Sequence, residues 1–263
     1  MPTISFATAN YAGRALDYDE REDYAEHVSA TIESTTLDQL DTLLSEIKSH
    51  GFPGIDLWMC HCDWQAHADD DFAEKVRRRV ADAGLTLNTY AGGASLSSPD
   101  ELDRLFGFMA RLGAPILSGI VWGLSDTAAA VQEVCEKHDL RWARENHEEK
   151  SAKEMLAGIG SGRHDRCGIT LDTSWCLRQG INALEAVKAV REHLFVVHLK
   201  DKRAGEEATC VLGEGVVPVE KIARYLVDTD WDGILSLEHE PLCCNPVPRV
   251  TTSLDILREW LAG

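Results

Sequence analysis

Four side chains able to bind a metal ion each stand at or near the end of a short apolar run. Glu145 ends RWARE, Asp172 ends GITLD, Glu238 ends GILSLE, and His198 lies within FVVHLKD. A lone histidine in such a position is more often a hydrogen-bonded core residue than a ligand. Three carboxylates and one imidazole on separate strands instead form the hard, oxygen-rich set that suits a divalent cation. We therefore predict a metal site held by all four residues, acceptable to Mn²⁺, Mg²⁺ or Co²⁺.

The elements that must position these residues alternate regularly along the chain. Eight strand-like segments are interleaved with eight helix-like segments, and such alternation calls for a parallel sheet. Eight repeats in 263 residues match a closed α/β barrel of the (β/α)8 (TIM barrel) class, in a single domain spanning residues 1–263. An open, doubly wound sheet is the structural alternative, but the glycine-rich first turn of a dinucleotide-binding fold is absent. The predicted strands are 3–9, 54–59, 85–91, 115–122, 140–145, 168–172, 194–200 and 233–238, and the predicted helices are 37–50, 70–83, 98–113, 125–138, 151–159, 182–191, 219–227 and 250–261.

The alternation of residue types within the strands indicates which side chains face the barrel interior. In FVVHLKD, His198 and Lys200 share one face and apolar residues share the other. Asp172 and Glu238 alternate with leucine and isoleucine in the same way. The run ending at Glu145 is less regular, because the residue before it is an arginine on the face that should be apolar. All four candidates lie at carboxyl ends of strands, where the active sites of barrels form.

The charge balance restricts the classes of partner. The chain has 44 acidic and 26 basic residues and a formal net charge of -18. Because phosphate contacts need Lys and Arg, this balance argues against nucleic acid and anionic membrane surfaces as partners. No apolar run is long enough to span a bilayer. The first residues, MPTISFATANYAG, lack a basic start and an apolar signal core, which predicts a cytoplasmic protein.

The cysteines favour a reducing compartment. There are eight, without a CxxC motif, and no disulfide framework is expected in a chain of this length. Cys60 and Cys62 flank His61, and Cys243 is followed directly by Cys244. Structural zinc usually pairs cysteines separated by roughly two to four residues, so we expect reduced thiols rather than a zinc site.

One connection is too long for an ordinary loop. Residues 11–36 are acidic and show no clear apolar period. Long segments of this kind are often functional, so this one is a candidate lid over the site. The alternative is a solvated excursion on the outside of the barrel.

A set of short motifs occurs in order along most of the chain. The motifs are GIDLW (54–58), ENH (145–147), LDTSW (171–175), VVHLKD (196–201), LGEGVVP (212–218) and LSLEHEP (235–241). Together they resemble the xylose-isomerase-like sugar phosphate isomerase/epimerase superfamily, over roughly residues 50–241. The resemblance implies a barrel that acts on sugars, with Glu145 and Glu238 as paired acid/base carboxylates in addition to their place among the metal ligands. It favours Glu238 over Glu240, because the family's glutamate precedes a proline by three residues.

Two positions depart from the tagatose- and psicose-type 3-epimerases of this superfamily. Those enzymes have a histidine three residues after the aspartate of the sixth strand, whereas this chain has Trp175 at that position. They also have an arginine about six residues after the histidine of the seventh strand, whereas Arg203 follows His198 by five. The resemblance is therefore better to members that process other keto-sugars or inositol derivatives.

The chemistry that such a site would perform is proton abstraction next to a carbonyl. A divalent cation stabilises the enediolate, a carboxylate takes the proton, and a second carboxylate can return it on the other face. We predict a metal-dependent sugar isomerase or epimerase, with a lyase or dehydratase on a keto-sugar or inosose as the alternative when a leaving group lies beta to the carbanion. A non-catalytic sugar-binding barrel is less favoured, because all four ligands are present. An apurinic endonuclease-type phosphodiesterase is disfavoured by the net charge and by Trp175, which occupies the place of one of its histidine ligands.

Several further residues are candidates for contact with a small sugar or keto-sugar substrate. Lys200 could polarise a carbonyl or form an ion pair with a ligand carboxylate. Tryptophans that end or follow strands could stack on a sugar ring, although such aromatics often only cap the core. A homodimer is compatible with the resemblance. The candidate substrate-binding residues are Lys200, His147, Trp58, Trp175, Arg203 and His61.

Overall fold

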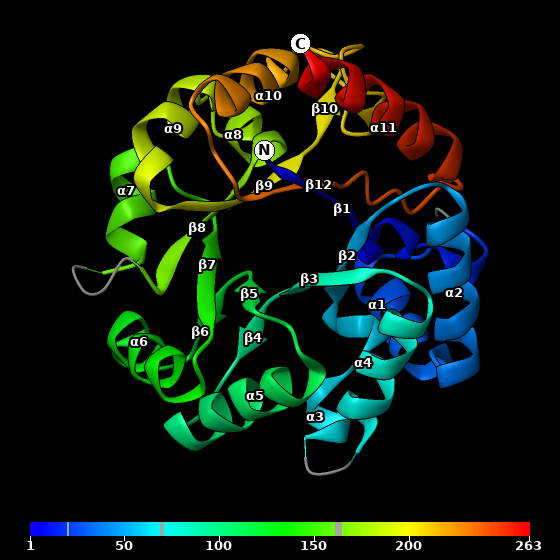
Figure 1. Ribbon diagram of the computed structural model, residues 1–263, viewed down its shortest axis with the longest axis vertical. Helices are drawn as coiled ribbons and strands as arrows, with labels where there is room; N and C mark the ends of the chain where they lie inside the picture. Colours follow the sequence, from blue (N-terminus) through cyan, green and yellow to red (C-terminus); the bar gives the residue numbers. More distant parts are fainter. Residues whose placement is uncertain (20, 69–70, 161–164) are drawn as a thin grey trace.

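Eight parallel strands close into a barrel in this computed structural model, which describes residues 1–19, 21–68, 71–160 and 165–263. Each strand pairs with the next one in the barrel, and β12 pairs with β1 to complete the closure (Figure 1). The predicted (β/α)8 barrel is therefore confirmed. In barrel order the strands are β1 (Thr3–Ala7), β2 (Gly54–Trp58), β3 (Thr86–Ala91), β5 (Ile116–Ser118), β7 (Arg141–Glu145), β8 (Cys167–Asp172), β9 (Leu194–Leu199) and β12 (Ile234–Leu237).

The main helices form a ring outside the strands (Figure 1). Their ends follow local signals in the sequence. Helix α5, for example, begins at Pro99 after the Ser98 hydroxyl caps it, and it ends before Gly113, which has the positive φ that glycine tolerates. The predicted start of α4 at residue 70 lies outside the described residues. The helices are α2 (Leu37–Ser49), α4 (Phe72–Asp82), α5 (Pro99–Leu112), α6 (Thr127–His138), α7 (Ala152–Gly158), α9 (Ala183–Val190), α10 (Val219–Asp228) and α11 (Val247–Ala262).

Apolar side chains fill two compartments. Outward-facing strand residues such as Leu171 and Leu235 pack against the helices in the main core. A smaller cluster inside the barrel contains Ala143 and Val196, each two positions before a predicted metal ligand, together with residues of β5 and β12. Buried polar residues, including Ser118, Thr170 and Ser236, also lie inside the barrel, and Ser118 contacts Thr170 and His198.

The segment after β1 is more ordered than its sequence predicts. It contains the short 3-10 turns η1 (Thr8–Tyr11) and η2 (Arg14–Leu16) and then helix α1 (Tyr24–Ser34). The expectation of an aperiodic excursion over residues 11–36 is wrong for α1. This helix begins with a capping box between Asp23 and Glu26, and the residues that it buries are the polar His27 and Thr31. A search for apolar periodicity therefore misses it.

The predicted strand 115–122 is broken in two. Strand β5 ends at Ser118, and Gly119 follows with a φ of +153°. A Cβ at this glycine would lie 1.8 Å from the carbonyl oxygen of Gly92, so only glycine fits this approach of two chain segments. Beyond the break, β6 (Val121–Trp122) pairs with β4 (Ala94–Ser95) in a separate two-stranded sheet.

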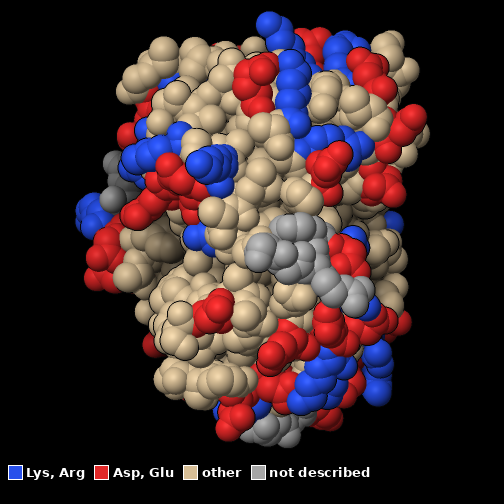
Figure 2. Space-filling model, turned by 90° about the vertical axis from the view of Figure 1, so that its left-hand side faces the viewer, with Lys and Arg blue, Asp and Glu red and all other residues tan. Residues whose placement is uncertain are grey.

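Shorter elements complete the loops at the two ends of the barrel. None of the eight cysteines forms a disulfide in the described part of the chain, and no helix within the described ranges combines the length and apolarity needed to cross a bilayer. On the face at the left of Figure 1, acidic and basic side chains are interspersed (Figure 2). The short elements are η3 (Met59–His61), α3 (Trp64–His67), α8 (Thr173–Arg178), η4 (Arg191–His193), β10 (Asp201–Lys202) and β11 (Thr209–Cys210).

Candidate metal centre and substrate cavity

The four predicted ligands meet at the carboxyl end of the barrel. Glu145 ends β7, Asp172 ends β8, His198 lies near the end of β9, and Glu238 follows β12 directly. These strands are neighbours in the barrel, and Asp172 pairs with His198 in the sheet register. One potential ligand atom from each residue lies within 4.8 Å of all the others. The structure therefore brings together the complete set that the sequence predicted.

Electrostatic contacts favour the ionised forms of Glu145 and Glu238 and the protonated form of His198. His198 Nδ1 lies 2.9 Å from Glu145 Oε1 and 2.8 Å from Glu238 Oε2. Burial alone would lower the pKa of His198, but the charges of Glu238 and Glu145 outweigh it and raise this pKa well above its usual value. Burial acts in the opposite sense on Glu238, yet His198 and Lys200 lower the pKa of Glu238 to about 2.

Lys200 supplies the other positive charge in the cluster. Its Nζ lies 3.0 Å from Asp172 Oδ2, 2.9 Å from Glu238 Oε2 and 3.4 Å from Glu240 Oε2. Of the two roles considered for this lysine, the structure has the ion pair with ligand carboxylates. Asp172 Oδ2 and Glu238 Oε2 are nevertheless buried without an aligned hydrogen bond. Buried carboxylate oxygens in this state are suited to a cation, so the residues present fit a divalent metal ion.

Asp172 is oriented by the start of the next helix. Its Oδ1 accepts hydrogen bonds from the backbone N–H groups of Ser174 and Trp175, at 2.7 and 3.0 Å, and so caps α8. Asn146 accepts from the Asp172 backbone N–H at 2.7 Å and donates to the Asp172 carbonyl at 3.3 Å. With one carboxylate oxygen and the backbone fixed in this way, Oδ2 is held toward the cluster.

A second buried asparagine fixes the segment that carries Glu238. Asn10 Nδ2 donates to the carbonyl of Leu237 at 2.9 Å, and Asn10 Oδ1 accepts from the backbone N–H groups of His239 and Glu240 at 2.5 and 3.2 Å. Glu240 has a φ of +49°, a conformation that is uncommon for a residue other than glycine. The asparagine holds this turn, so that both glutamates point toward Lys200.

A cavity of about 500 Å³ opens above the cluster. His147 and Trp175 stack in its wall with ring centroids 4.6 Å apart, and His147 Nε2 lies 3.4 Å from Glu145 Oε2. Tyr24 of α1 also lines the cavity and donates a hydrogen bond to Glu240 Oε1 at 2.8 Å. Part of the 11–36 segment therefore does reach the site. The residues that line the cavity include Ala9, Tyr24, Trp58, Gly92, Gly93, Ile120, Trp122, Glu145, His147, Trp175, Arg178, His198, Lys200, Glu238 and Glu240.

A sequence comparison gives the family of this barrel. The family model described as xylose isomerase-like TIM barrel matches residues 44–260. The chain belongs to this family. No curated protein matches it in sequence.

Solved structures share the fold of this xylose isomerase-like barrel at low sequence identity. A D-allulose 3-epimerase from Methylomonas sp., in complex with D-allulose, has a TM-score of 0.73 at 12% identity, over 98% of this chain and 96% of its own. An L-ribulose 3-epimerase has a TM-score of 0.72 at 15% identity, over 100% and 95%. A probable 3-DHS dehydratase from Bacillus anthracis has a TM-score of 0.66 at 16% identity, over 98% and 99%. At these identities, the similarity concerns the fold.

Four of the six candidate substrate-binding residues of this xylose isomerase-like barrel line the cavity, namely Lys200, His147, Trp58 and Trp175. Two do not. Arg203 lies beside the β10–β11 hairpin and forms ion pairs with Glu214 and Glu206.

The His61 ring lies behind Trp58, with ring centroids 5.5 Å apart, and lines a different cavity. The resemblance suggested Arg203, and His61 was a candidate because it follows the second strand, but neither basis predicts where a side chain in a turn points.

The structure adds site residues that the sequence analysis did not propose as substrate contacts. Tyr24 was missed because α1 was missed, although the capping-box pattern from Asp23 to Glu26 was a usable signal. Glu240 reaches the cavity from the turn after β12 that Asn10 holds. Arg178, whose guanidinium lies 5.0 Å above the Trp175 ring, follows from no sequence pattern.

Proposed function

We propose that this protein is a divalent-metal-dependent sugar isomerase or epimerase that acts by removing a proton alpha to a carbonyl group. The observation that carries the proposal is the convergence of the four ligand atoms within 4.8 Å at the base of a 500 Å³ cavity. Membership of the xylose isomerase-like family supports a sugar as substrate. So does the similarity in fold to two 3-epimerases.

The proposed roles of the ligands follow from their contacts. A divalent ion held by Glu145, Asp172, His198 and Glu238 would stabilise the negative charge of an enediolate. Glu145 and Glu238 are the proposed acid/base pair. Both contact Nδ1 of His198, at 2.9 and 2.8 Å. The positive charges of His198 and Lys200 lower the pKa of Glu238, so this carboxylate is ionised at neutral pH, the state that a general base requires.

The cavity walls suit a polyhydroxylated ring. Trp58, Trp122 and the stacked pair His147 and Trp175 offer flat surfaces, which can contact the C–H face of a sugar. Lys200 and Glu240 lie deeper, beside the cluster. They can hydrogen-bond hydroxyl groups of the substrate and fix which carbon faces the acid/base pair.

Elimination of water from a keto-sugar or inosose is the second candidate function. It begins with the same proton abstraction, after which the C–O bond at the beta carbon breaks and the hydroxyl leaves as water with a proton from a donor. Two donors on the cavity wall favour this candidate, the Lys200 ammonium and the Tyr24 hydroxyl. The similarity in fold to a probable 3-DHS dehydratase also supports it.

The test is proton exchange in deuterated water. The protein is loaded with Mn²⁺ or Mg²⁺ and incubated with a panel of ketoses, ketose phosphates and inososes. Activity is assayed with both ions, and the products of the Mg²⁺ reactions are analysed by NMR. We expect loss of one carbon-bound proton from the true substrate. An epimer or isomer as product assigns the first candidate, and an unsaturated product assigns the second.

Variants of the acid/base pair sharpen this test. Glu145→Gln and Glu238→Gln are expected to lower the exchange rate by about 10²- to 10⁴-fold, whereas the surface variant Arg224→Gln should keep the wild-type rate. Circular dichroism checks that each variant is folded. Absence of exchange with every compound, with and without metal, would contradict the proposed function.

A further inference from the structure

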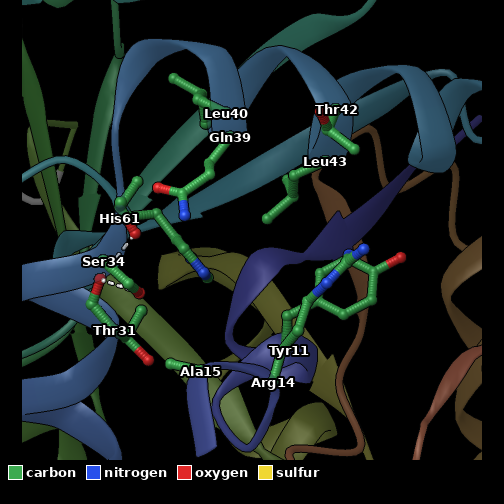
Figure 3. Close-up of a pocket in the computed structure, with 11 residues that line it drawn as sticks. Tyr11, Arg14, Ala15, Thr31, Ser34, Gln39, Leu40, Thr42, Leu43 and His61 are labelled. Carbon is green, nitrogen blue, oxygen red and sulfur yellow. Dashed lines mark hydrogen bonds between the residues drawn. The ribbon is translucent and has the colours of Figure 1, made fainter. Parts of the chain in front are cut away.

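A second cavity lies beside the barrel, separate from the metal cluster. It lies between α1, α2 and the turns that follow β1 and β2, it is open to solvent, and it has a volume of about 340 Å³ (Figure 3). None of its described lining residues also lines the cavity above the cluster. Cavities that hold small molecules occupy roughly 300–1,000 Å³, so this one has room for a small ligand.

His61 presents a hydrogen-bond donor to this cavity. Its side chain is only 5% exposed, and the ring extends into the space between the labelled residues of Figure 3. Thr8 Oγ1 accepts from the Trp58 backbone N–H at 2.8 Å and lies 3.1 Å from His61 Nδ1. We assign Thr8 as the donor in this hydrogen bond, because its Oγ1 already accepts the Trp58 N–H, and Nδ1 is then the acceptor. In a neutral imidazole, the proton is then on Nε2, the nitrogen on the cavity side.

The ring is neutral because of its surroundings. Burial, together with the positive charge of Arg14, lowers the pKa of His61 to about 3. The ring is therefore neutral at neutral pH, and with Nδ1 as the acceptor from Thr8, its Nε2–H can donate to a ligand or to water.

Two further donors face the same space. Gln39 uses its Oε1 to accept the Thr36 backbone N–H at 2.8 Å, which leaves its amide nitrogen for the cavity. Arg14 uses Nη1 in an ion pair with Glu46 at 2.8 Å, and its other N–H groups remain available. Among the described lining residues, Arg14 is the one charged side chain, and none is Asp or Glu.

The side-chain hydroxyl groups that line this cavity, in contrast, can act only as acceptors toward a ligand, because their protons are donated to backbone carbonyls. Ser34 and Thr35 donate their protons to the backbone carbonyl of Thr31, at 3.3 and 2.7 Å, and Thr42 donates to the carbonyl of Asp38 at 3.1 Å. Their oxygens retain lone pairs, so a ligand must supply hydroxyl protons to satisfy them. Leu40 and Leu43 complete the wall with an apolar surface.

We propose that this cavity binds a small hydroxylated carboxylate, a compound of the sugar-acid class. Its carboxylate accepts from His61, Gln39 and Arg14, and its hydroxyl groups donate to the oxygens of the α1 and α2 residues. The carbon chain packs against the two leucines. This site is independent of the metal cluster and does not rest on the function proposed for it.

The test measures binding of D-gluconate to metal-free protein by isothermal titration calorimetry. Metal-free conditions prevent gluconate from coordinating an ion in the other cavity. Two related compounds separate the contributions, D-glucose without the carboxylate and hexanoate without the hydroxyls. We expect saturable binding of gluconate, and binding of both related compounds weaker by at least about tenfold, which corresponds to about 1.4 kcal/mol.

Variants locate the binding. His61→Phe keeps a ring against Trp58 but removes the donor, and Arg14→Gln removes the charge. Each should weaken gluconate binding by about tenfold or more. Glu238→Gln, in the other cavity, and Arg224→Gln, on the surface of α10, should leave the affinity within about twofold. If His61→Phe does not fold, Gln39→Leu combined with Thr35→Val tests the same contacts from residues nearer the surface.

A crystal soaked in gluconate provides the direct observation, with density expected between α1 and α2. The inference is overturned if no saturation occurs up to roughly 10 mM. It is also overturned if Glu238→Gln abolishes binding while His61→Phe retains it, because gluconate would then occupy the cavity above the cluster.

Discussion

The two carboxylate oxygens of Asp172 make different contacts. Oδ1 caps α8 through two backbone N–H groups, and Oδ2 faces Lys200 and the other ligands. A carboxylate fixed by a helix start needs no further ordering when it binds a cation. The carboxylate of Asp172 is therefore already oriented toward the other predicted ligands.

Asn146 is the residue whose loss should loosen this arrangement. Asn146→Ala removes both hydrogen bonds to the Asp172 backbone, and partners that orient metal ligands typically contribute about 10- to 100-fold to affinity. We expect the affinity for Mn²⁺ to fall within this range, as measured by calorimetry. Asn182→Ala, which removes the cap of α9 far from the cluster, is the matched control, and equal affinities of the two variants would contradict the role of Asn146.

We expect Lys200 to stabilise the metal-free protein and to lower its affinity for a metal ion. Its ammonium lies 3.0 and 2.9 Å from two ligand oxygens, where it neutralises buried charge and repels an incoming cation. In protein freed of metal by a chelator, Lys200→Met should lower the free energy of unfolding by about 3–5 kcal/mol, the usual effect of breaking a buried ion pair.

The same change should enlarge the stabilisation that Mn²⁺ provides. Thermal unfolding with and without Mn²⁺ measures the difference in Tm, which we expect to exceed that of the wild type. Lys188→Met, on the exposed face of α9, controls for loss of a lysine. A metal-induced rise in Tm no larger than that of the wild type is the contrary result.

At this scale, the sequence predicts ligands better than the residues that support them. Period-two alternation carries Asp172, His198 and Glu238 to the inner face of their strands, and the closed barrel brings them together. The roles of Asn10 and Asn146 depend on backbone groups far away in sequence, such as the carbonyl of Leu237. No local pattern could reveal them.

At the scale of elements, Asp201 organises the loop before α10. It is fully buried at the start of β10 and accepts hydrogen bonds from the backbone N–H groups of Gly213, Gly215 and Val217, at 2.9, 3.0 and 3.1 Å. This explains the LGEGVVP motif in physical terms. A Cβ at Gly215 would lie 2.1 Å from Asp201 Oδ1, so the carboxylate can reach these groups only if this position is glycine.

Two glycine variants test this reading of the loop. Gly215→Ala forces the loop away from Asp201 and leaves buried N–H groups without partners, which should cost at least about 2 kcal/mol. Gly107→Ala is the control, since a Cβ there has only ordinary contacts inside α5, the closest at 3.6 Å. It should stabilise the protein by about 0.5–1 kcal/mol. Urea unfolding measures both, and equal effects would contradict the proposed clamp.

The bounds of a helix or strand could be predicted closely where the local sequence carried strong capping or periodicity signals. Helix α5, with a serine cap, a proline at its start and a glycine at its end, was predicted nearly to the residue. Helix α1 buries His27 and Thr31 instead of apolar residues, and the break at Gly119 depends on the distant Gly92. In both cases the deciding contact is tertiary and leaves no apolar pattern.

At the scale of the whole molecule, stability should fall as the pH falls below about 6.5. Burial and the charge of Arg14 lower the pKa of His61 to about 3 in the folded protein, whereas the unfolded chain binds this proton near pH 6.5. Between these values the unfolded state holds more protons, so each pH unit of acidification costs about 1.4 kcal/mol until the folded histidine also titrates.

The comparison with His61→Phe isolates this contribution. Urea unfolding at about pH 7.5 and about pH 5 should show that the wild type loses about 2 kcal/mol more than the variant. Equal losses would show that His61 titrates alike in both states. Because the comparison is a difference between pH values, a constant effect of the substitution on stability cancels.

The closed barrel itself was the most predictable feature. Eight alternating repeats allow few arrangements, and the handedness and parallel pairing of strands leave the barrel as the one that fits this length. The alternation of strands and helices does not predict the shape of the opening above the barrel. That shape comes from α1 and from the β4–β6 ladder, which are additions to the repeat.

The β4–β6 ladder gives the opening unequal sides. Along one stretch of the rim, Ala94 and Leu96 donate backbone hydrogen bonds to Ile120 and Trp122 at 2.8 and 3.0 Å, and a main chain tied in this way cannot move without breaking its sheet. Elsewhere on the rim, Tyr24 contributes a side chain that rotates about single bonds. A bulky sugar would therefore enter by rearrangement of Tyr24. The size of the molecules that enter should be set by residues of α1. Gly92, Gly93 and Trp122, in and beside the ladder, should fix the pose of the bound molecule.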